Sequence, residues 1–245
     1  MKIIKSKLFE RFPEIVFGMS TKIGLDRKSP FYFNLSFTVG DSAAIVRENR
    51  NVFFNELGLD PNQVAYQKQI HSDLIKFTET PGLLGESDAL ITTKQNIGLA
   101  ISTADCTPIF VYDPENKIIA AVHSGWRGTQ KQILKKTIDN LINNFNTKAK
   151  NLFVYVGPSI SQKNYEVGEE VGAQFDQKYI KNQNGRLYLD VLKANVDMLN
   201  DFMIPTNQIE VSHLCTYSEK ELLHSFRRDG NFSGRSLGVI AMKSD

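Results

Sequence analysis

The sequence predicts an α/β (α+β) fold with mixed β-sheets, in a single domain that spans residues 1–245. Short apolar, β-branched runs occur in mixed order with helical stripes, and several expected strands follow one another with no helix between them. A purely parallel sheet does not allow that order, because parallel neighbours need long crossover connections. No low-complexity linker or internal repeat divides the chain, and 245 residues suffice for one well-buried core.

The expected strands are apolar or alternating segments bounded by turn residues. They cover residues 14–18, 31–39, 64–70, 89–92, 97–102, 108–112, 118–122, 152–156, 187–189, 209–211 and 237–241. The expected helices carry apolar residues at helical spacing, and the first begins after a capping Asp-Ser pair and stops at a glycine. They cover residues 43–57, 129–145, 167–179 and 192–203.

Two of these strands form a hairpin around which the chain is organised. Residues 108–112 and 118–122 flank the turn-forming sequence Asp-Pro-Glu-Asn at 113–116. Cys106 precedes the first strand and His123 follows the second, so the hairpin brings these two side chains together. One of only two cysteines then lies beside one of only four histidines, which indicates a site.

His71 also stands at the end of an expected strand, and with Cys106 and His123 it completes a possible ligand set. Two imidazoles and a thiolate are typical of catalytic zinc, which keeps a fourth position open and lowers the pKa of a bound water toward about 7. The same donors suit copper. Two alternatives remain open: Cys106 is a buried apolar residue beside hydrogen-bonded histidines, or Cys106 is a nucleophile with His123 as its base.

Basic residues in two glycine-containing loops are candidate anion ligands. Arg127 lies in the run HSGWRG beside Trp126, which is either a stacking surface or a core residue. Arg227, Arg228 and Arg235 lie in the run FRRDGNFSGR, which is either an anion-binding loop or an exposed basic turn.

A second cluster combines His213 and Cys215, which alternate on one expected strand face, with His224. No glycine-rich loop follows it, so we rank it below the first set, and we expect His224 on a surface turn.

Charge and cysteine content exclude several function classes. A net charge of +2 is too small to indicate nucleic-acid or membrane binding. Two cysteines do not form a disulfide framework and fit free thiols in a reducing compartment. The first 15 residues are interrupted by charges, and no apolar run reaches about 18 residues. We therefore expect a cytoplasmic protein without a signal peptide or a membrane span.

Taken together, the motifs of the chain resemble those of the YfiH or laccase-domain family, also described as multicopper polyphenol oxidase-like or purine nucleoside phosphorylase-like. The matching motifs are NLSFTVGD (34–41), ENR (48–50), QKQIHS (67–72), SDALIT (87–92), LAISTADCTPIFVYDP (99–114), IAAVHSGWRGT (119–129), VGPSI (156–160), YEVGEEV (165–171) and FRRDGNFSGR (226–235). The resemblance implies a layered α/β/β/α sandwich similar to cytotoxic necrotising factor-type cysteine hydrolases. It also implies a zinc site on His71, Cys106 and His123.

The resemblance further implies a purine nucleoside enzyme. Expected reactions are phosphorolysis of adenosine, inosine, guanosine and methylthioadenosine, together with adenosine deamination. The partners would be purine nucleosides and phosphate, with no nucleic acid or membrane, in a monomer or homodimer. Older relatives were described as copper-dependent phenol oxidases, and others are linked to peptidoglycan editing, which would suit a metal-free Cys–His hydrolase or amidase. Four histidines are few for a multicopper centre. A non-catalytic binding protein that kept the fold is a further alternative.

The implied chemistry selects further candidate residues. The zinc deaminase signature H-x-E with P-C-x-x-C is absent, so another carboxylate must act as acid or base, and Asp105 and Asp88 are the candidates. Phosphorolysis needs a cationic phosphate ligand, for which we consider Arg50, Arg127 and Arg228. Ser124, which follows His123, is a further candidate for substrate binding.

Overall fold

The structure, a computed structural model, describes residues 1–244. Its strands are β1 (Ile3–Ile4), β2 (Ile15–Ser20), β3 (Val64–Lys68), β4 (Ile75–Phe77), β5 (Gly82–Glu86), β6 (Ala89–Thr92), β7 (Gly98–Thr103), β8 (Thr107–Asp113), β9 (Ile118–Ser124), β10 (Phe153–Val156), β11 (Glu166–Val167), β12 (Ile180–Gln183), β13 (Arg186–Leu189), β14 (Ile209–Val211) and β15 (Ser236–Met242). Its α-helices are α1 (Ala43–Glu56), α2 (Trp126–Gln130), α3 (Ile133–Phe145), α4 (Glu169–Gly172), α5 (Val191–Asp201) and α6 (Phe226–Asp229).

Two mixed six-stranded sheets form the centre of the molecule. The first has the order β1-β2-β15-β7-β3-β5, and the second has the order β14-β10-β8-β9-β6-β4. Their inner faces share one apolar cluster, in which Phe17 and Ile240 of the first sheet pack with Phe110 and Tyr155 of the second. Both sheets combine parallel and antiparallel pairs, as the order of the elements predicted.

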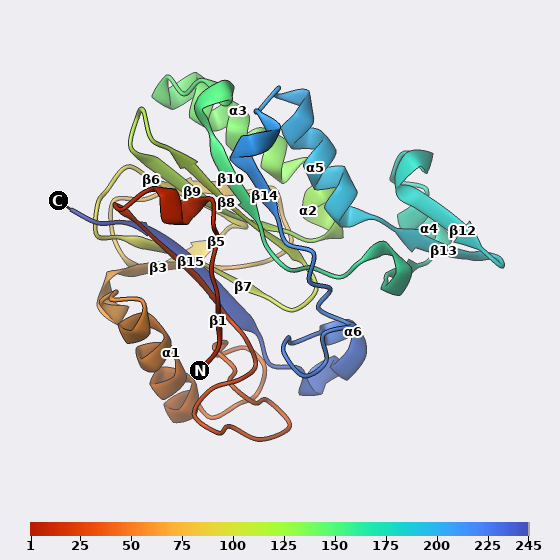
Figure 1. Cartoon of the computed structure of the whole chain (residues 1–245). Coiled ribbons are helices and arrows are strands. Elements are labelled where there is room, and N and C mark those ends of the chain that lie inside the picture. Colours follow the sequence, from red (N-terminus) through yellow and green to blue (C-terminus); the bar gives the residue numbers. More distant parts are fainter. Residues whose placement is uncertain (245) are drawn as a thin grey trace.

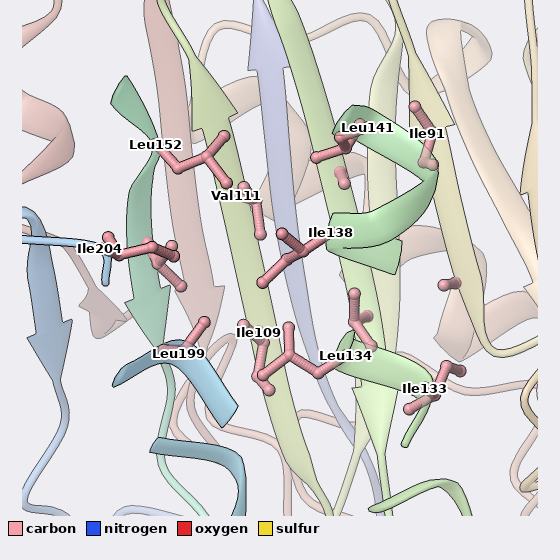
Figure 2. Packing of buried hydrophobic residues seen from close by; sticks show 14 of the residues in the cluster. Ile91, Ile109, Val111, Ile133, Leu134, Ile138, Leu141, Leu152, Leu199 and Ile204 are labelled. Atoms are coloured by element: carbon pink, nitrogen blue, oxygen red, sulfur yellow. The ribbon is translucent and has the colours of Figure 1, made fainter. Parts of the chain in front are cut away.

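Helices cover the two outer faces of this sandwich (Figure 1). Phe53 and Phe54 of α1 pack on the first sheet. Ile138 of α3 and Leu199 of α5 pack on the second sheet, where Figure 2 shows them against Ile109 and neighbouring strand residues. The resulting α/β/β/α layers confirm the predicted fold class.

The β8–β9 hairpin confirms the prediction for residues 108–122 and lies in the middle of the second sheet. Thr107 pairs with Ser124 and Asp113 with Ile118, so both strands are slightly longer than predicted. All residues of both strands are buried, because sheet neighbours flank them and another layer covers each face. The carboxylate of Asp113 accepts the backbone N–H groups of Glu115 and Asn116 and so fixes the turn.

The predicted helix over residues 167–179 is wrong. This part of the chain belongs to a small arm that projects from the sandwich, with the three-stranded sheet β11-β13-β12 and the single turn α4 (Figure 1). Val167, Val171, Phe175 and Tyr179 do share one apolar cluster, which explains their regular spacing. They reach it from a strand, a helical turn, a bend and a short 3-10 helix, because the chain changes direction on either side of α4.

Two further predictions need correction. The predicted strand or extended segment at 31–39 consists of turns and irregular backbone, because the side chain of Asn34 bonds the backbone of Ser36 and of Arg235 in place of a ladder. The predicted helix over 129–145 is split into α2 and α3, since Gln132 has the left-handed φ of 61°. In residues 1–244, no helix is long and apolar enough to span a membrane.

Candidate metal centre and cleft

The three predicted ligands come together where the chain passes between the two sheets. His71 lies in the connection from β3 of the first sheet to β4 of the second, and Cys106 lies in the turn from β7 of the first to β8 of the second. His123 lies within β9, opposite Pro108. Neither Cys106 nor His71 belongs to a regular strand, so each is positioned by the ends of the strands beside it.

The ligand atoms of these residues all lie within 4.8 Å of one another. Cys106 Sγ is 3.8 Å from His71 Nε2, and the two imidazole rings are 4.9 Å apart at 78°. Bond lengths to zinc place sulfur and nitrogen ligands of a tetrahedral site about 3.6 Å apart. His71 is exposed, whereas His123 is buried, so the set opens on one side. The three residues therefore lie close enough to share one metal ion, with one side left open.

Gly125 leaves the space in which these ligands meet. A Cβ atom on Gly125 would lie 2.8 Å from Cys106 Sγ and 3.1 Å from His71 Cδ2. Both distances are shorter than ordinary van der Waals contact. The backbone angles of Gly125, φ −75° and ψ 176°, suit any residue, so its conformation does not require a glycine. Glycine is required at this position because two candidate ligands approach it closely.

Asp88 lies behind the ligands and is fully buried. Its carboxylate accepts His123 Nδ1–H at 2.8 Å, the backbone N–H of His71 at 3.1 Å, and both the N–H and the hydroxyl of Ser72 at 2.6 and 2.7 Å. Burial raises the pKa of Asp88, but the bonds from His123 and Ser72 outweigh it and lower the pKa to about 2. Asp88 does not line the cleft, so we do not assign it as the acid or base that acts on a substrate.

The Cys106 thiol and the buried His123 imidazole shift each other's pKa. Burial raises the pKa of Cys106, but His123 and His71 beside it outweigh that effect and lower the pKa to about 6. Burial lowers the pKa of His123, while Cys106 and Asp88 raise it above its ordinary value. The site therefore favours a thiolate at neutral pH, which is the form that both metal binding and nucleophilic attack require.

A cleft of about 980 Å³ opens over the ligand set. Its walls are rich in cationic and aromatic side chains, and among residues 1–244 Asp105 is the single carboxylate that lines it. The cationic residues are Arg50, Lys68, Arg127, Arg227 and Arg235, and the aromatic residues are Phe37, Tyr66, Trp126, Tyr165 and Phe226. Such a surface suits a ligand that combines a flat ring with an anionic group.

Arg50 is the most firmly held of the cleft arginines that we predicted. Its Nε donates to the carbonyl of Leu35 at 2.7 Å, and its guanidinium stacks on Phe37 and Tyr66 at 4.5 and 4.4 Å from the ring centres. Burial lowers its pKa, with Tyr66 acting in the opposite direction. Arg127, in contrast, is exposed and lies 4.2 Å over Trp126.

Asp105 lines the cleft next to Cys106 and has the left-handed φ of 94°. Its carboxylate accepts the hydroxyl of Thr216 and the backbone N–H of Arg227, both at 2.6 Å. The side chain of Arg227 continues to the carbonyl of Glu166 in the arm. Asp105, directly and through Arg227, thus links its own turn to residues 216–227 and to the arm around one side of the cleft.

Two predicted substrate-binding residues do not reach the cleft. Ser124 is fully buried and its hydroxyl bonds Thr129 and Asn195, because strand alternation turns it to the face opposite His123. The guanidinium of Arg228 is saturated by Asp229 and by backbone carbonyls, among them that of Thr216. Neither residue lines the cleft.

The second cluster does not come together as one site among residues 1–244. His213 is exposed, and the thiol of Cys215 instead accepts bonds from the backbone N–H and hydroxyl of Ser161 at 3.3 and 3.1 Å. The expected surface position of His224 is wrong: only 2% of it is exposed, and burial lowers its pKa to about 3. Its imidazole approaches the carbonyl of Phe33 and fills the core beside the irregular segment at 31–39.

Sequence reasoning missed most of the aromatic wall of the cleft. Tyr165 carried one signal, since it begins the motif 165–171, but its place beside Arg227, whose guanidinium lies 4.9 Å over its ring, follows from the fold of the arm. Phe37 carried a similar signal, since it lies in the motif 34–41. Tyr66 lies in no motif, and a half-buried aromatic residue in a strand usually belongs to the core.

Comparison with known proteins agrees with this fold and site. Residues 16–243 match the family model described as "Multi-copper polyphenol oxidoreductase laccase". A purine nucleoside phosphorylase of Bacteroides thetaiotaomicron is 33% identical over 85% of this chain and 84% of its own length. One of Clostridium acetobutylicum is 38% identical over 74% and 77%, and purine nucleoside phosphorylase YlmD of Bacillus subtilis is 30% identical over 94% and 89%.

Two crystal structures resemble the whole chain. YlmD of Geobacillus stearothermophilus has a TM-score of 0.91 and 26% identity, covering 98% of this chain and 94% of its own. The hypothetical protein YfiH of Bacillus licheniformis has a TM-score of 0.89 and 29% identity, covering 96% and 95%. The chain therefore belongs to the multi-copper polyphenol oxidoreductase laccase family, the YfiH-like or laccase-domain family that its motifs predicted.

Proposed function

We propose that this protein is a purine nucleoside phosphorylase with a zinc site formed by His71, Cys106 and His123. The observation that carries the proposal is the position of this set in a cleft whose walls combine arginines with aromatic rings. Purine bases stack on aromatic rings, and arginine binds phosphate through two parallel hydrogen bonds. Relatives that are 30% or more identical are named purine nucleoside phosphorylases, which supports the same activity here.

Phosphorolysis is a displacement at the ribose. A phosphate oxygen forms a bond to C1′, the bond from C1′ to the purine nitrogen breaks, and the purine leaves with the electron pair and takes up a proton. Arg50 is our candidate phosphate ligand, because its stacked guanidinium needs little reorganisation. Trp126 and Tyr165 provide faces for the base, with Arg127 and Arg227 beside them.

A zinc ion at His71, Cys106 and His123 would supply Lewis-acid polarisation and lower the pKa of a bound water. Adenosine deamination then becomes a second reaction of the same cleft, in which water adds at C6 of adenine and ammonia leaves. Asp105 is the candidate proton carrier, because within the described part of the chain it is the single carboxylate that lines the cleft. Methylthioadenosine is accepted if the open cleft holds the 5′ group.

Turnover assays and metal analysis test the proposal. Purified protein is incubated with adenosine, inosine, guanosine and methylthioadenosine, with and without phosphate, and free base, ribose 1-phosphate and inosine are quantified. We expect phosphate-dependent release of the base, and about one zinc per chain. Copper in place of zinc, together with phenol oxidation, would instead support the polyphenol oxidase alternative.

The two cysteines give a matched pair of variants for this test. Cys106→Ala should abolish zinc binding and turnover, whereas Cys215→Ala, which removes the other free thiol outside the cleft, should retain both. His123→Ala and His213→Ala make the same comparison for a buried cleft histidine and an exposed one. Full activity of Cys106→Ala or His123→Ala would show that the assigned site is wrong.

One observation favours a second candidate, a metal-free cysteine hydrolase or amidase. His123 lies between the thiol of Cys106 and the carboxylate of Asp88, which bonds its Nδ1 at 2.8 Å. A nucleophile, a base and an orienting carboxylate in this order form a catalytic triad. This candidate is supported if purified protein holds no zinc, loses activity on alkylation of Cys106 and cleaves amide substrates. It fails if chelators abolish the activity.

A further inference from the structure

We infer that Asp88 is a positioning residue that fixes both histidines of the ligand set from one buried carboxylate. The inference rests on the metal site proposed above. Asp88 does not line the cleft and is fully buried, so it acts through His71 and His123 and not on a substrate. Its two oxygens join the loop that carries His71 to the strand that carries His123, two segments 52 positions apart in sequence.

On the His71 side, the carboxylate binds three consecutive backbone N–H groups. One oxygen accepts from His71 at 3.1 Å, and the other accepts from Ile70 at 3.3 Å and from Ser72 at 2.6 Å. A left-handed residue among successive N–H groups lets them converge on one anion, and His71 has a φ of 59°. The anion therefore holds His71 in a left-handed conformation that is uncommon for residues other than glycine, with its imidazole near Cys106.

On the His123 side, two bonds act on the same residue. Asp88 accepts Nδ1–H of the imidazole at 2.8 Å through its carboxylate, and it accepts the backbone N–H of His123 at 2.7 Å through its carbonyl. With the proton on Nδ1, Nε2 is the nitrogen left for a metal or for Cys106. A carboxylate behind a ligand imidazole fixes its tautomer and its ring orientation, and loss of such a partner typically lowers metal affinity 10- to 100-fold.

Asp88→Asn tests this role with little change of shape. Its amide can still accept from His123, but its NH₂ group would face the N–H groups of residues 70 and 72. We expect the zinc dissociation constant to rise at least 10-fold, measured by competition with a chromophoric chelator. The thiolate-to-metal absorption of the cobalt-substituted protein should shift, because the ligand geometry changes.

Asp113→Asn is the matched control. Asp113 is also fully buried, and its carboxylate accepts two backbone N–H groups where that of Asp88 accepts three, but it lies at the far end of the β8–β9 hairpin. We expect this variant to lose stability while it keeps the wild-type zinc affinity and cobalt spectrum. Equal losses of affinity in the two variants would reduce Asp88 to a general stabilising residue and overturn the inference.

A second measurement does not depend on zinc. The ring Nδ1–H of His123, assigned by its loss in His123→Ala, should be protected from exchange with water in wild-type NMR spectra and unprotected in Asp88→Ala. The assignment is simple because the chain has four histidines. Wild-type protein that binds no zinc would overturn the proposed metal site, and the ring N–H would still test the role of Asp88. An unchanged ring N–H in Asp88→Ala would overturn the inference.

Discussion

Replacing Gly125 by alanine tests the convergence of the ligands with the smallest possible change. The added methyl group would lie 2.8 Å from Cys106 Sγ and 3.1 Å from His71 Cδ2. To reach ordinary contact at about 3.4 Å, the sulfur must withdraw by about 0.6 Å and the ring by about 0.3 Å. Metal–ligand distances tolerate about 0.2 Å, so the variant cannot keep the wild-type ligand geometry.

The expected size of the effect follows from linkage. A tenfold loss of zinc affinity removes about 1.4 kcal/mol of the stabilisation that excess zinc gives to the folded state. For a chain of this length, about 1 kcal/mol corresponds to about 2–4 °C in melting temperature. We therefore expect the zinc-dependent rise in melting temperature of Gly125→Ala to be smaller than that of the wild type by at least about 3 °C.

Gly168→Ala is the control for this measurement. Gly168 also precedes a short helix, with nearly the same backbone angles, φ −74° and ψ 167°. A methyl group there meets the mobile carboxylate end of Glu170, which can move away. The control should keep the full response to zinc. If Gly125→Ala also keeps it, and chelator competition gives its zinc affinity within twofold of wild type, the inferred convergence of Cys106 and His71 is refuted.

Three further predictions concern residues outside the ligand set of His71, Cys106 and His123. Glu14→Gln should destabilise the protein at neutral pH. The hydrogen bond from Tyr112 outweighs burial and holds the folded-state pKa of Glu14 at about 2, below its unfolded value. The ionised carboxylate therefore stabilises the fold fully above about pH 5, and this stabilisation is lost as the pH falls toward 2. Urea midpoints of both proteins should converge over that range, and a constant difference would contradict the assignment. Ile138→Ala should lower the free energy of unfolding by about 2–5 kcal/mol through the cavity it leaves between α3 and the second sheet, measured by urea denaturation. Arg50→Ala should raise the KM for phosphate at least tenfold and change the KM for inosine less. Arg186→Ala in the exposed arm should change neither value. Equal kinetics of the two variants would exclude Arg50 as the phosphate ligand.

The hydrophobic pattern along the sequence predicted the strands that are apolar on both faces. The β8–β9 hairpin was evident because two buried runs flank a turn whose Asp113 bonds the following N–H groups. Local pattern did not assign strands to sheets: β6 and β7 are neighbours in sequence, yet they belong to different sheets. Hydrophobic alternation sets which face of a strand is buried and carries no information about its partner.

The candidate site shows the same division. Cys106 and His123 could be paired from the hairpin alone, and His71 from its place at a strand end. Which carboxylate lines the cleft could not be predicted, because aspartate at a strand start is common both beside clefts and in buried hydrogen-bond networks. Asp88 and Asp105 therefore looked equivalent in sequence, although one is enclosed behind the histidines and the other lines the cleft.

The chain crosses from the first sheet to the second at both His71 and Cys106. Each crossing spans the seam of the sandwich, while His123 belongs to the second sheet alone. A complete set of donor atoms therefore exists only after the two sheets have docked, and neither half of the molecule can capture an ion by itself. A metal ion at the proposed site would therefore bind only after the two sheets have docked, and it would link the two halves of the core at the edge where the cleft opens.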